Sequence, residues 1–230
     1  MNDQKSKLYA VLTGDLVKSQ KLSIEDLESA RRHLLSAVDK VSDWKPGLVR
    51  GKAEFFRGDA WQLLLADPGQ ALRVAVYLRA SVRAQGLSQT RISIGLGTVD
   101  LVDEERVSLS IGEAFVLSGH GLDKLKKQRL AIEVPHSVGV LTNWIRVVAH
   151  LCDAIVSQWT ARQSEITTFA LEPVERTHSE IAEELNIKQQ TVTNSLRGAR
   201  WNAVQEGIEL FDQTDWEAVF RGDPANQSFC

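Results

Sequence analysis

The chain has 230 residues, of which 43% are hydrophobic and 25% are charged, and these proportions exclude a disordered, collagen-like or low-complexity protein. It has no run of about 18 apolar residues and begins with a polar segment, so we expect no membrane-spanning helix, no secretory signal and a cytoplasmic location. Two cysteines, Cys152 and Cys230, are too few for a disulfide framework or a zinc site, and Cys152 is expected to be a buried thiol. The net charge of −3 divides into +3 for residues 1–140 and −6 for residues 141–230. Any contact of the second half with nucleic acid therefore needs a local basic surface.

The first half alternates strand and helix patterns. Short apolar or alternating runs predict strands at residues 8–12, 49–56, 60–65, 91–97 and 130–134, of which 91–97 has the pattern of a half-buried strand. Amphipathic spacing predicts helices at residues 24–41, from Pro68 onward, and at 111–127. The order βαββαβαβ predicts an α+β fold in which helices cover a sheet.

Strand patterns stop after residue 136, and the sequence predicts an all-α domain over residues 137–230. Helices are expected at residues 138–157, from Thr160 to the break at Pro173, from the capping box of Thr177 and Glu180, and at 201–211. The segment after Asp212 is expected to fray, except for a short helix that docks on the fold. In the first of these helices, one apolar face is predicted to be formed by Leu141, Trp144, Ile145, Val148, Leu151, Cys152 and Ile155.

Two Gly-Asp pairs suggest a ligand site in the first half. Asp15 is expected just past the first strand and Asp59 in a hairpin turn, so adjacent strands would place both carboxylates at one edge of the sheet. Paired carboxylates bind Mg²⁺ or Mn²⁺, and Gly14 and Gly58 allow a tight backbone. A nucleotide or phosphate ligand is expected to contact Gly14, Leu16, Val17, Lys18, Ser19 and Arg57. The alternative is that both pairs are ordinary turns.

Several segments together resemble the SatD family of bacterial proteins. They are residues 9–19 (YAVLTGDLVKS), 57–65 (RGDAWQLLL), 92–97 (ISIGLG) and the helical stretch from 151–163 (LCDAIVSQWTARQ) onward. The first half of that family is similar to class III nucleotide cyclases and GGDEF domains. The resemblance therefore implies a nucleotide cyclase-like domain of the palm or ferredoxin-like type over residues 1–136, and a homodimer.

The resemblance to cyclases includes the separation of the two metal-binding aspartates but not the residues that complete catalysis. Where class III cyclases carry an Asn and, four residues later, an Arg, this chain has Val116 and His120. Valine forms no hydrogen bond, and histidine lacks the planar fork of arginine. The GGDEF signature fits poorly too, because Ala60 and Trp61 replace its Glu and Phe. We therefore expect ligand binding without turnover.

A helix-turn-helix is predicted over residues 177–211, with Asn186 in the left-handed turn position. Its small core is expected to contain Ile181, Leu185, Ile187, Val192 and Leu196. Duplex DNA is expected to contact Lys188, Gln189, Gln190, Thr191, Thr193, Asn194, Arg197 and Arg200. Residues 188–200 contain three basic residues and no acidic one, which is the local charge that groove binding needs. The alternative is a helical hairpin used for protein contacts.

Three hypotheses follow for the whole chain. The leading one is a SatD-like DNA-binding regulator whose cyclase-like domain binds a divalent metal and a nucleotide or phosphate ligand without catalysis. The second is a metal-dependent nucleotidyl cyclase or transferase in which Arg57 or Lys18 supplies the missing cation. The third is a scaffold that mediates protein contacts only.

Overall fold

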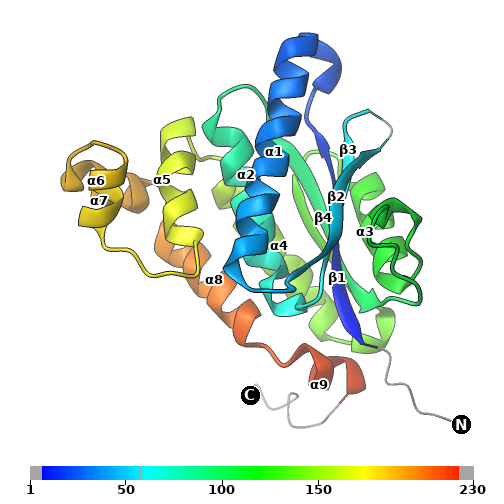
Figure 1. Cartoon of the computed structure of the whole chain (residues 1–230). Coiled ribbons are helices and arrows are strands. Elements are labelled where there is room, and N and C mark those ends of the chain that lie inside the picture. Colours follow the sequence, from blue (N-terminus) through cyan, green and yellow to red (C-terminus); the bar gives the residue numbers. More distant parts are fainter. Residues whose placement is uncertain (1–6, 57, 223–230) are drawn as a thin grey trace, which may run out of the picture.

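The computed structural model describes residues 7–56 and 58–222, so Arg57 and Cys230 lie outside the described residues. The first half consists of strands and helices in the predicted order (Figure 1), and the chain is a mixed α+β protein. These elements are β1 (Leu8–Leu16), α1 (Ile24–Trp44), β2 (Val49–Phe56), β3 (Ala60–Leu65), α2 (Ala71–Ala84), β4 (Thr90–Thr98), α3 (Glu113–Lys124) and β5 (Leu130–Glu133). Short 3-10 turns lie at Ser19–Lys21, Pro68–Gln70, Val107–Leu109 and His136–Val138.

The five strands form one sheet in the order β2-β3-β1-β4-β5. β1 runs antiparallel to both β3 and β4, and β5 joins the edge of β4 in parallel. Helices α1 and α2 cover one face of the sheet and α3 covers the other (Figure 1). Alternate residues of β1 follow this division, since Leu12 packs into the core beneath α1 and α2 while Val11 packs against Ala114 of α3.

Strand β1 is four residues longer than its apolar run predicted. Thr13, Gly14 and Asp15 continue the strand, because each has a partner in both β3 and β4. The expectation that Asp15 follows the strand is therefore wrong, and its backbone is held within the sheet. β4 is also buried on both faces rather than half-buried, because α3 approaches it closely: a Cβ on Gly95 would lie 2.2 Å from the carbonyl oxygen of Ala114.

The second half is helical, as predicted. It contains α4 (Leu141–Val156), α5 (Ala161–Leu171), α6 (His178–Glu184), α7 (Gln189–Gly198), α8 (Trp201–Gln213) and α9 (Trp216–Arg221). The Thr177 capping box is present, and Thr160 forms a second one at the start of α5. The short helix expected after Asp212 is α9, which packs through Trp216, and Asp212 itself forms an ion pair with Arg73 of α2 at 2.6 Å.

The two halves share an apolar core. α2 packs against α5 and α8, and α4 packs against β5, so buried side chains continue from the sheet into the helices. Between α2 and α4, Arg79 and Asp153 form a buried ion pair at 2.9 Å. The division at residue 136 stays a prediction, since a continuous core neither requires nor forbids it. Within the described chain, no helix has the length and apolarity to cross a membrane.

The predicted apolar face of α4 is confirmed except at two positions, because Leu141, Ile145, Val148 and Ile155 are half-buried and pack against the core. Cys152 is buried as expected, and desolvation raises the pKa of its thiol to about 11. However, Trp144 and Leu151, which were assigned to the same face, are exposed. Ala149 and Val156 are buried with Cys152 instead. Helical spacing assigned Trp144 and Leu151 to the buried face because α4 also carries apolar residues on its solvent side.

Candidate functional site

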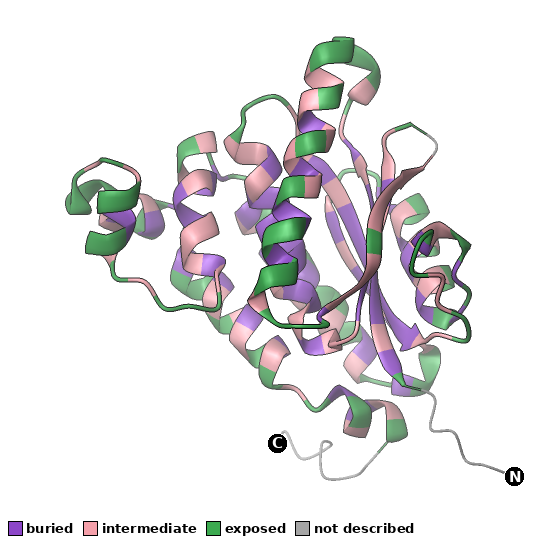
Figure 2. Cartoon of the chain, viewed as in Figure 1, coloured by how far each residue is buried: buried purple, intermediate pink, exposed green. Residues whose placement is uncertain are grey.

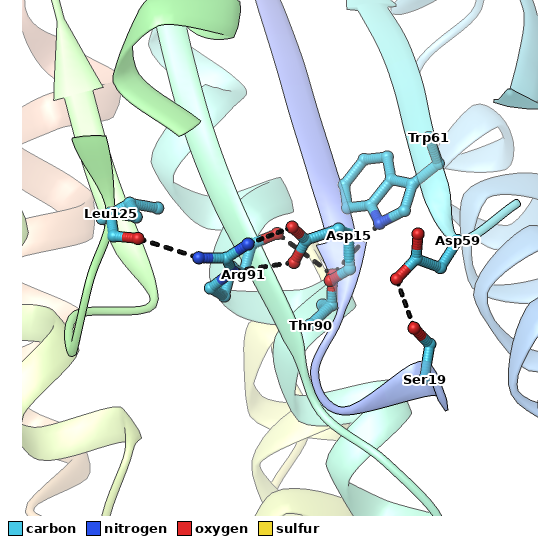
Figure 3. A network of polar contacts seen from close by, with 7 residues as sticks. All are labelled: Asp15, Ser19, Asp59, Trp61, Thr90, Arg91 and Leu125. Atoms are coloured by element: carbon cyan, nitrogen blue, oxygen red, sulfur yellow. Dashed lines mark hydrogen bonds and ion pairs between the residues drawn. The ribbon is translucent and has the colours of Figure 1, made fainter. Parts of the chain in front are cut away.

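Asp15 is bound by an arginine that the sequence did not single out. Asp15 of β1 lies opposite Arg91 of β4 in the antiparallel register, and both side chains lie on the α3 side of the sheet. Arg91 donates from Nε to Asp15 Oδ1 at 2.8 Å and from Nη2 to Oδ2, while its Nη1 donates to the carbonyl of Leu125 at 2.8 Å (Figure 3). The hydrogen bond to Asp15 is the largest cause that raises the pKa of Arg91, and the charge of Asp59 raises it further. Three charged side chains thus meet at this edge.

Asp59 lies at the same edge but points to a different partner. It comes directly before β3, and one of its carboxylate oxygens accepts a hydrogen bond from the Ser19 hydroxyl (Figure 3). The chain therefore brings the two predicted aspartates onto neighbouring strands, as expected. Their carboxylates are used by Arg91 and Ser19 rather than directed at a shared point.

This arrangement does not match the donor set of a resident Mg²⁺ or Mn²⁺ ion. Both oxygens of Asp15 accept hydrogen bonds from Arg91, whose positive charge already balances the carboxylate. Among residues 7–56 and 58–222, no three His, Cys, Asp or Glu side chains are grouped so that they could hold a metal. The divalent cation predicted at this edge stays a prediction.

Part of the predicted phosphate segment is already hydrogen-bonded within the fold. The backbone N–H of Leu16 donates to the carbonyl of Asp59 at 3.3 Å, and that of Val17 donates to the carbonyl of Gln89 at 2.7 Å. These two N–H groups are therefore bonded within the fold, whereas the prediction had them open to a phosphate ligand. Lys18 follows in the left-handed conformation at φ 58°, and it leads into the turn that places Ser19 beside Asp59.

The close packing of the sheet requires a glycine at position 14, whether or not a ligand binds there. A Cβ at this position would lie 2.5 Å from the indole ring of Trp61 and 2.6 Å from the carbonyl oxygen of Arg91. The fully buried Trp61 donates from its indole nitrogen to the Thr90 hydroxyl at 3.0 Å, and Thr90 donates to the carbonyl of Asp15 at 2.8 Å (Figure 3). The strand that carries Asp15 is thus fixed from both sides. Gly58, by contrast, has φ 88° and open space around it, as a turn glycine does.

The positions that correspond to the cyclase Asn and Arg lie on the solvent side of α3. Val116 and His120 are both exposed, one turn apart. The opposite side of α3 faces the sheet, where the hydroxyls of Ser118 and Thr13 lie 2.8 Å apart. Val116 and His120 therefore add no hydrogen-bonding group to the Asp15 edge of the same chain in the described contacts.

A second candidate site lies on α7, at the far end of the helical half. α6 and α7 are joined by a short turn in which Asn186 has φ 50°, the left-handed conformation that the sequence predicted. Figure 2 shows that α6 and α7 expose most of their outer surface. Behind them, Ile181 and Val192 are buried, and the buried Trp159 donates from its indole nitrogen to the carbonyl of Ala199 at 2.8 Å. α7 is thus held firmly from one side and open on the other.

The predicted DNA-contacting residues lie on this open side, with one exception. Thr193 is half-buried rather than exposed, and its hydroxyl lies 3.0 Å from Nδ1 of His178, while its contact with DNA stays a prediction. Asn194 Oδ1 accepts from Gln190 at 3.3 Å and from Arg197 at 2.8 Å, so these side chains contact one another rather than the rest of the fold. The exposed residues are Lys188, Gln189, Gln190, Thr191, Asn194, Arg197 and Arg200.

Comparison with known proteins leaves the family open. No protein-family model matches the chain, and no curated protein matches it. A solved structure with some similarity is that of the guanylyl cyclase Cya2, with a TM-score of 0.38 and 18% identity, covering 54% of this chain and 74% of that chain. Similarity at this level assigns neither fold nor activity, so both are derived from the chain's own residues.

Proposed function

We propose that the protein is a SatD-like regulator that binds duplex DNA through α7, which acts as the second helix of a helix-turn-helix. The observation that carries this proposal is the exposed face of α7, where the hydrogen bonds of Gln190, Asn194 and Arg197 within the described part of the chain run among these three side chains. A helix held from behind and polar in front can enter a major groove as a rigid unit. Gln and Asn suit adenine edges there, and Arg suits guanine or phosphate.

The charges around α7 support a local contact with phosphate. Lys188, Arg197 and Arg200 are exposed, and residues 188–200 contain no acid within a half of the chain that carries a net charge of −6. On the neighbouring α6, Glu184 is already paired with Arg176, which reduces its repulsion of phosphate. Binding is therefore expected to be weak on arbitrary DNA and to depend on the matched sequence.

The N-terminal half is proposed to bind a phosphate-bearing ligand at the edge of Asp15 and Asp59. The observation that favours this site is the presence of the Arg91 guanidinium and the Ser19 hydroxyl at one end of three adjacent strands. Because Asp15 and Asp59 leave this edge with a net negative charge, the phosphate ligand would have to bring a cation that offsets it. Cyclisation of a nucleoside triphosphate is not part of the proposal, because Val116 and His120 offer no cation fork. Incubation with Mn²⁺ and each triphosphate is therefore expected to yield no cyclic product.

The DNA proposal is tested with the full-length protein and duplex fragments from its own genomic neighbourhood, near 50 mM salt. We expect a fragment to be retained, and retention to fall sharply in the double variant Arg197→Ala with Arg200→Ala. Arg162→Ala is the matched control, because Arg162 is a surface arginine of α5 that pairs with Glu165 and lies outside the α7 face.

Two results would count against the proposal. One is failure of the wild type to retain any such fragment, and the other is an equal loss of retention in the control variant. In either case the DNA proposal fails, and the scaffold hypothesis, in which the polar face of α7 contacts a protein, becomes the one to test.

A further inference from the structure

Helix α4 carries a stripe of exposed apolar side chains. Val140, Trp144, Val147 and Leu151 are between 46% and 75% exposed. Val140 directly precedes the helix in helical conformation, so the stripe begins at the first turn. Large apolar side chains gathered in this way, rather than scattered singly, mark interaction surfaces on soluble proteins.

The spacing of the stripe is that of a helix pair. The four residues are separated by four, three and four positions, and the exposed Ala154 follows three positions later. Apolar residues that repeat every 3.5 positions form the seam of two helices that pack side by side. On the opposite side, Ala149, Cys152 and Val156 are buried against the core. A helix that is apolar on both sides needs cover on both, and the fold covers only one.

We propose that this apolar stripe, called the seam from here on, packs against α4 of a second copy of the chain. A helix pair requires a partner with the same 3.5-residue spacing, and a two-fold axis supplies it without any other protein. The seam contains no charged residue, and the residues that flank it, Asn143 and His150, do not form a run of like charge. Arg146 on the same helix is bound to Glu133 at 2.6 Å. Two copies can therefore meet along α4 without like charges facing each other.

The size of the seam sets the expected strength. The 16 residues of α4 span about 24 Å. A single pair of helices of this length is a small contact compared with the specific interfaces of proteins, which begin at about 1,200 Å² of buried area. The dimer is therefore expected to dissociate in the micromolar range, so that its mass depends on concentration. This inference does not depend on DNA binding, although a two-fold dimer also suits the paired half-sites that helix-turn-helix proteins bind.

The test is the mass of the full-length protein by sedimentation, measured from about 1 to 100 μM. We expect the wild type to shift from monomer to dimer in this range and Leu151→Lys to remain a monomer. Leu109→Lys is the matched control, because Leu109 is exposed to a similar extent (50% against 57% for Leu151) but lies in the turn before α3. The control is expected to dimerise as the wild type does. At about 1 μM, where all three proteins are expected to be monomers, both variants should melt at the wild-type temperature, since neither position is buried.

Three results would overturn the proposal: a wild type that stays monomeric at 100 μM, a Leu151→Lys variant that still dimerises, or a Leu109→Lys variant that loses the dimer to the same extent. A second seam variant, Val147→Lys, guards against a local effect of one substitution. It too must be monomeric if α4 forms the interface.

Discussion

The two candidate sites differ in what the fold has already done with their polar groups. At the sheet edge, Asp15 is bound by Arg91 and Asp59 by Ser19, so the predicted ligand-binding groups are held by other parts of the chain. On α7, Gln190, Asn194 and Arg197 contact only one another at the surface. Residue type suggested both sites equally well. The difference shows that a polar residue is a better candidate for an outside partner when its hydrogen bonds are not consumed inside the fold.

The largest expected effect is at Gly14, where the edge has no room for a side chain. Gly14→Ala brings a Cβ within 2.6 Å of both a buried indole and a backbone oxygen, so we expect a loss of about 3 kcal/mol in the free energy of unfolding, measured in urea. Gly119→Ala in α3 is the control, because nothing lies within 4 Å of its new Cβ. Alanine there should stabilise the helix by about 0.5–1 kcal/mol. Equal effects of the two substitutions would show that the edge is not tightly packed.

Removal of an arginine should affect the two sites differently. Arg91→Ala leaves the carboxylate of Asp15, which is only 16% exposed, without its partner. We expect the free energy of unfolding to fall by about 2 kcal/mol. The loss is smaller than for a fully buried ion pair, because this pair is partly exposed. Arg197→Ala should change stability by less than about 0.5 kcal/mol, because Arg197 is exposed and contacts only Asn194. A comparable loss of stability in Arg91→Ala and Arg197→Ala would contradict the difference between the sheet edge and α7.

Mn²⁺ titration separates a ligand site from a purely structural ion pair at the edge. If a divalent cation binds Asp15 and Asp59, it competes with Arg91, so Mn²⁺ should raise the melting temperature of Arg91→Ala more than that of the wild type. Asp59→Asn should remove the increase in both backgrounds. Identical melting temperatures with and without Mn²⁺ in all of these proteins would refute the predicted metal site.

The smallest effect concerns the helix that supports α7. Hydrogen bonds from the backbone and hydroxyl of Thr177 lower the pKa of Glu180, so the carboxylate favours the folded state above its unfolded pKa. That contribution is lost as the pH falls through the folded pKa. Between pH 6 and pH 3.5, Glu180→Gln should therefore lose less stability than the wild type. Glu183→Gln, an exposed change on the same helix, should follow the wild type.

The sequence predicted the elements better than the contacts between them. Periodicity located every strand and helix of the first half to within a few residues, because each has an apolar run or apolar spacing of its own. It missed the pairing of Arg91 with Asp15, which depends on the register of strands that lie 76 positions apart in sequence. It also placed Trp144 and Leu151 on the buried face of α4, since spacing cannot tell a side buried in the fold from an apolar side that the fold leaves exposed. The left-handed Asn186 was predictable because the turn geometry is local.

The most direct test of the central claim, that α7 binds DNA, is the salt dependence of binding to a retained fragment. The slope of log affinity against log salt should be smaller in magnitude for Arg197→Ala by about 0.9, because one phosphate contact is lost. Gln190→Ala should leave that slope unchanged. It should reduce the difference in binding free energy between matched and unmatched DNA sequences by about 1–3 kcal/mol. A slope for Arg197→Ala equal to that of the wild type, with unchanged sequence preference in both variants, would contradict the claim.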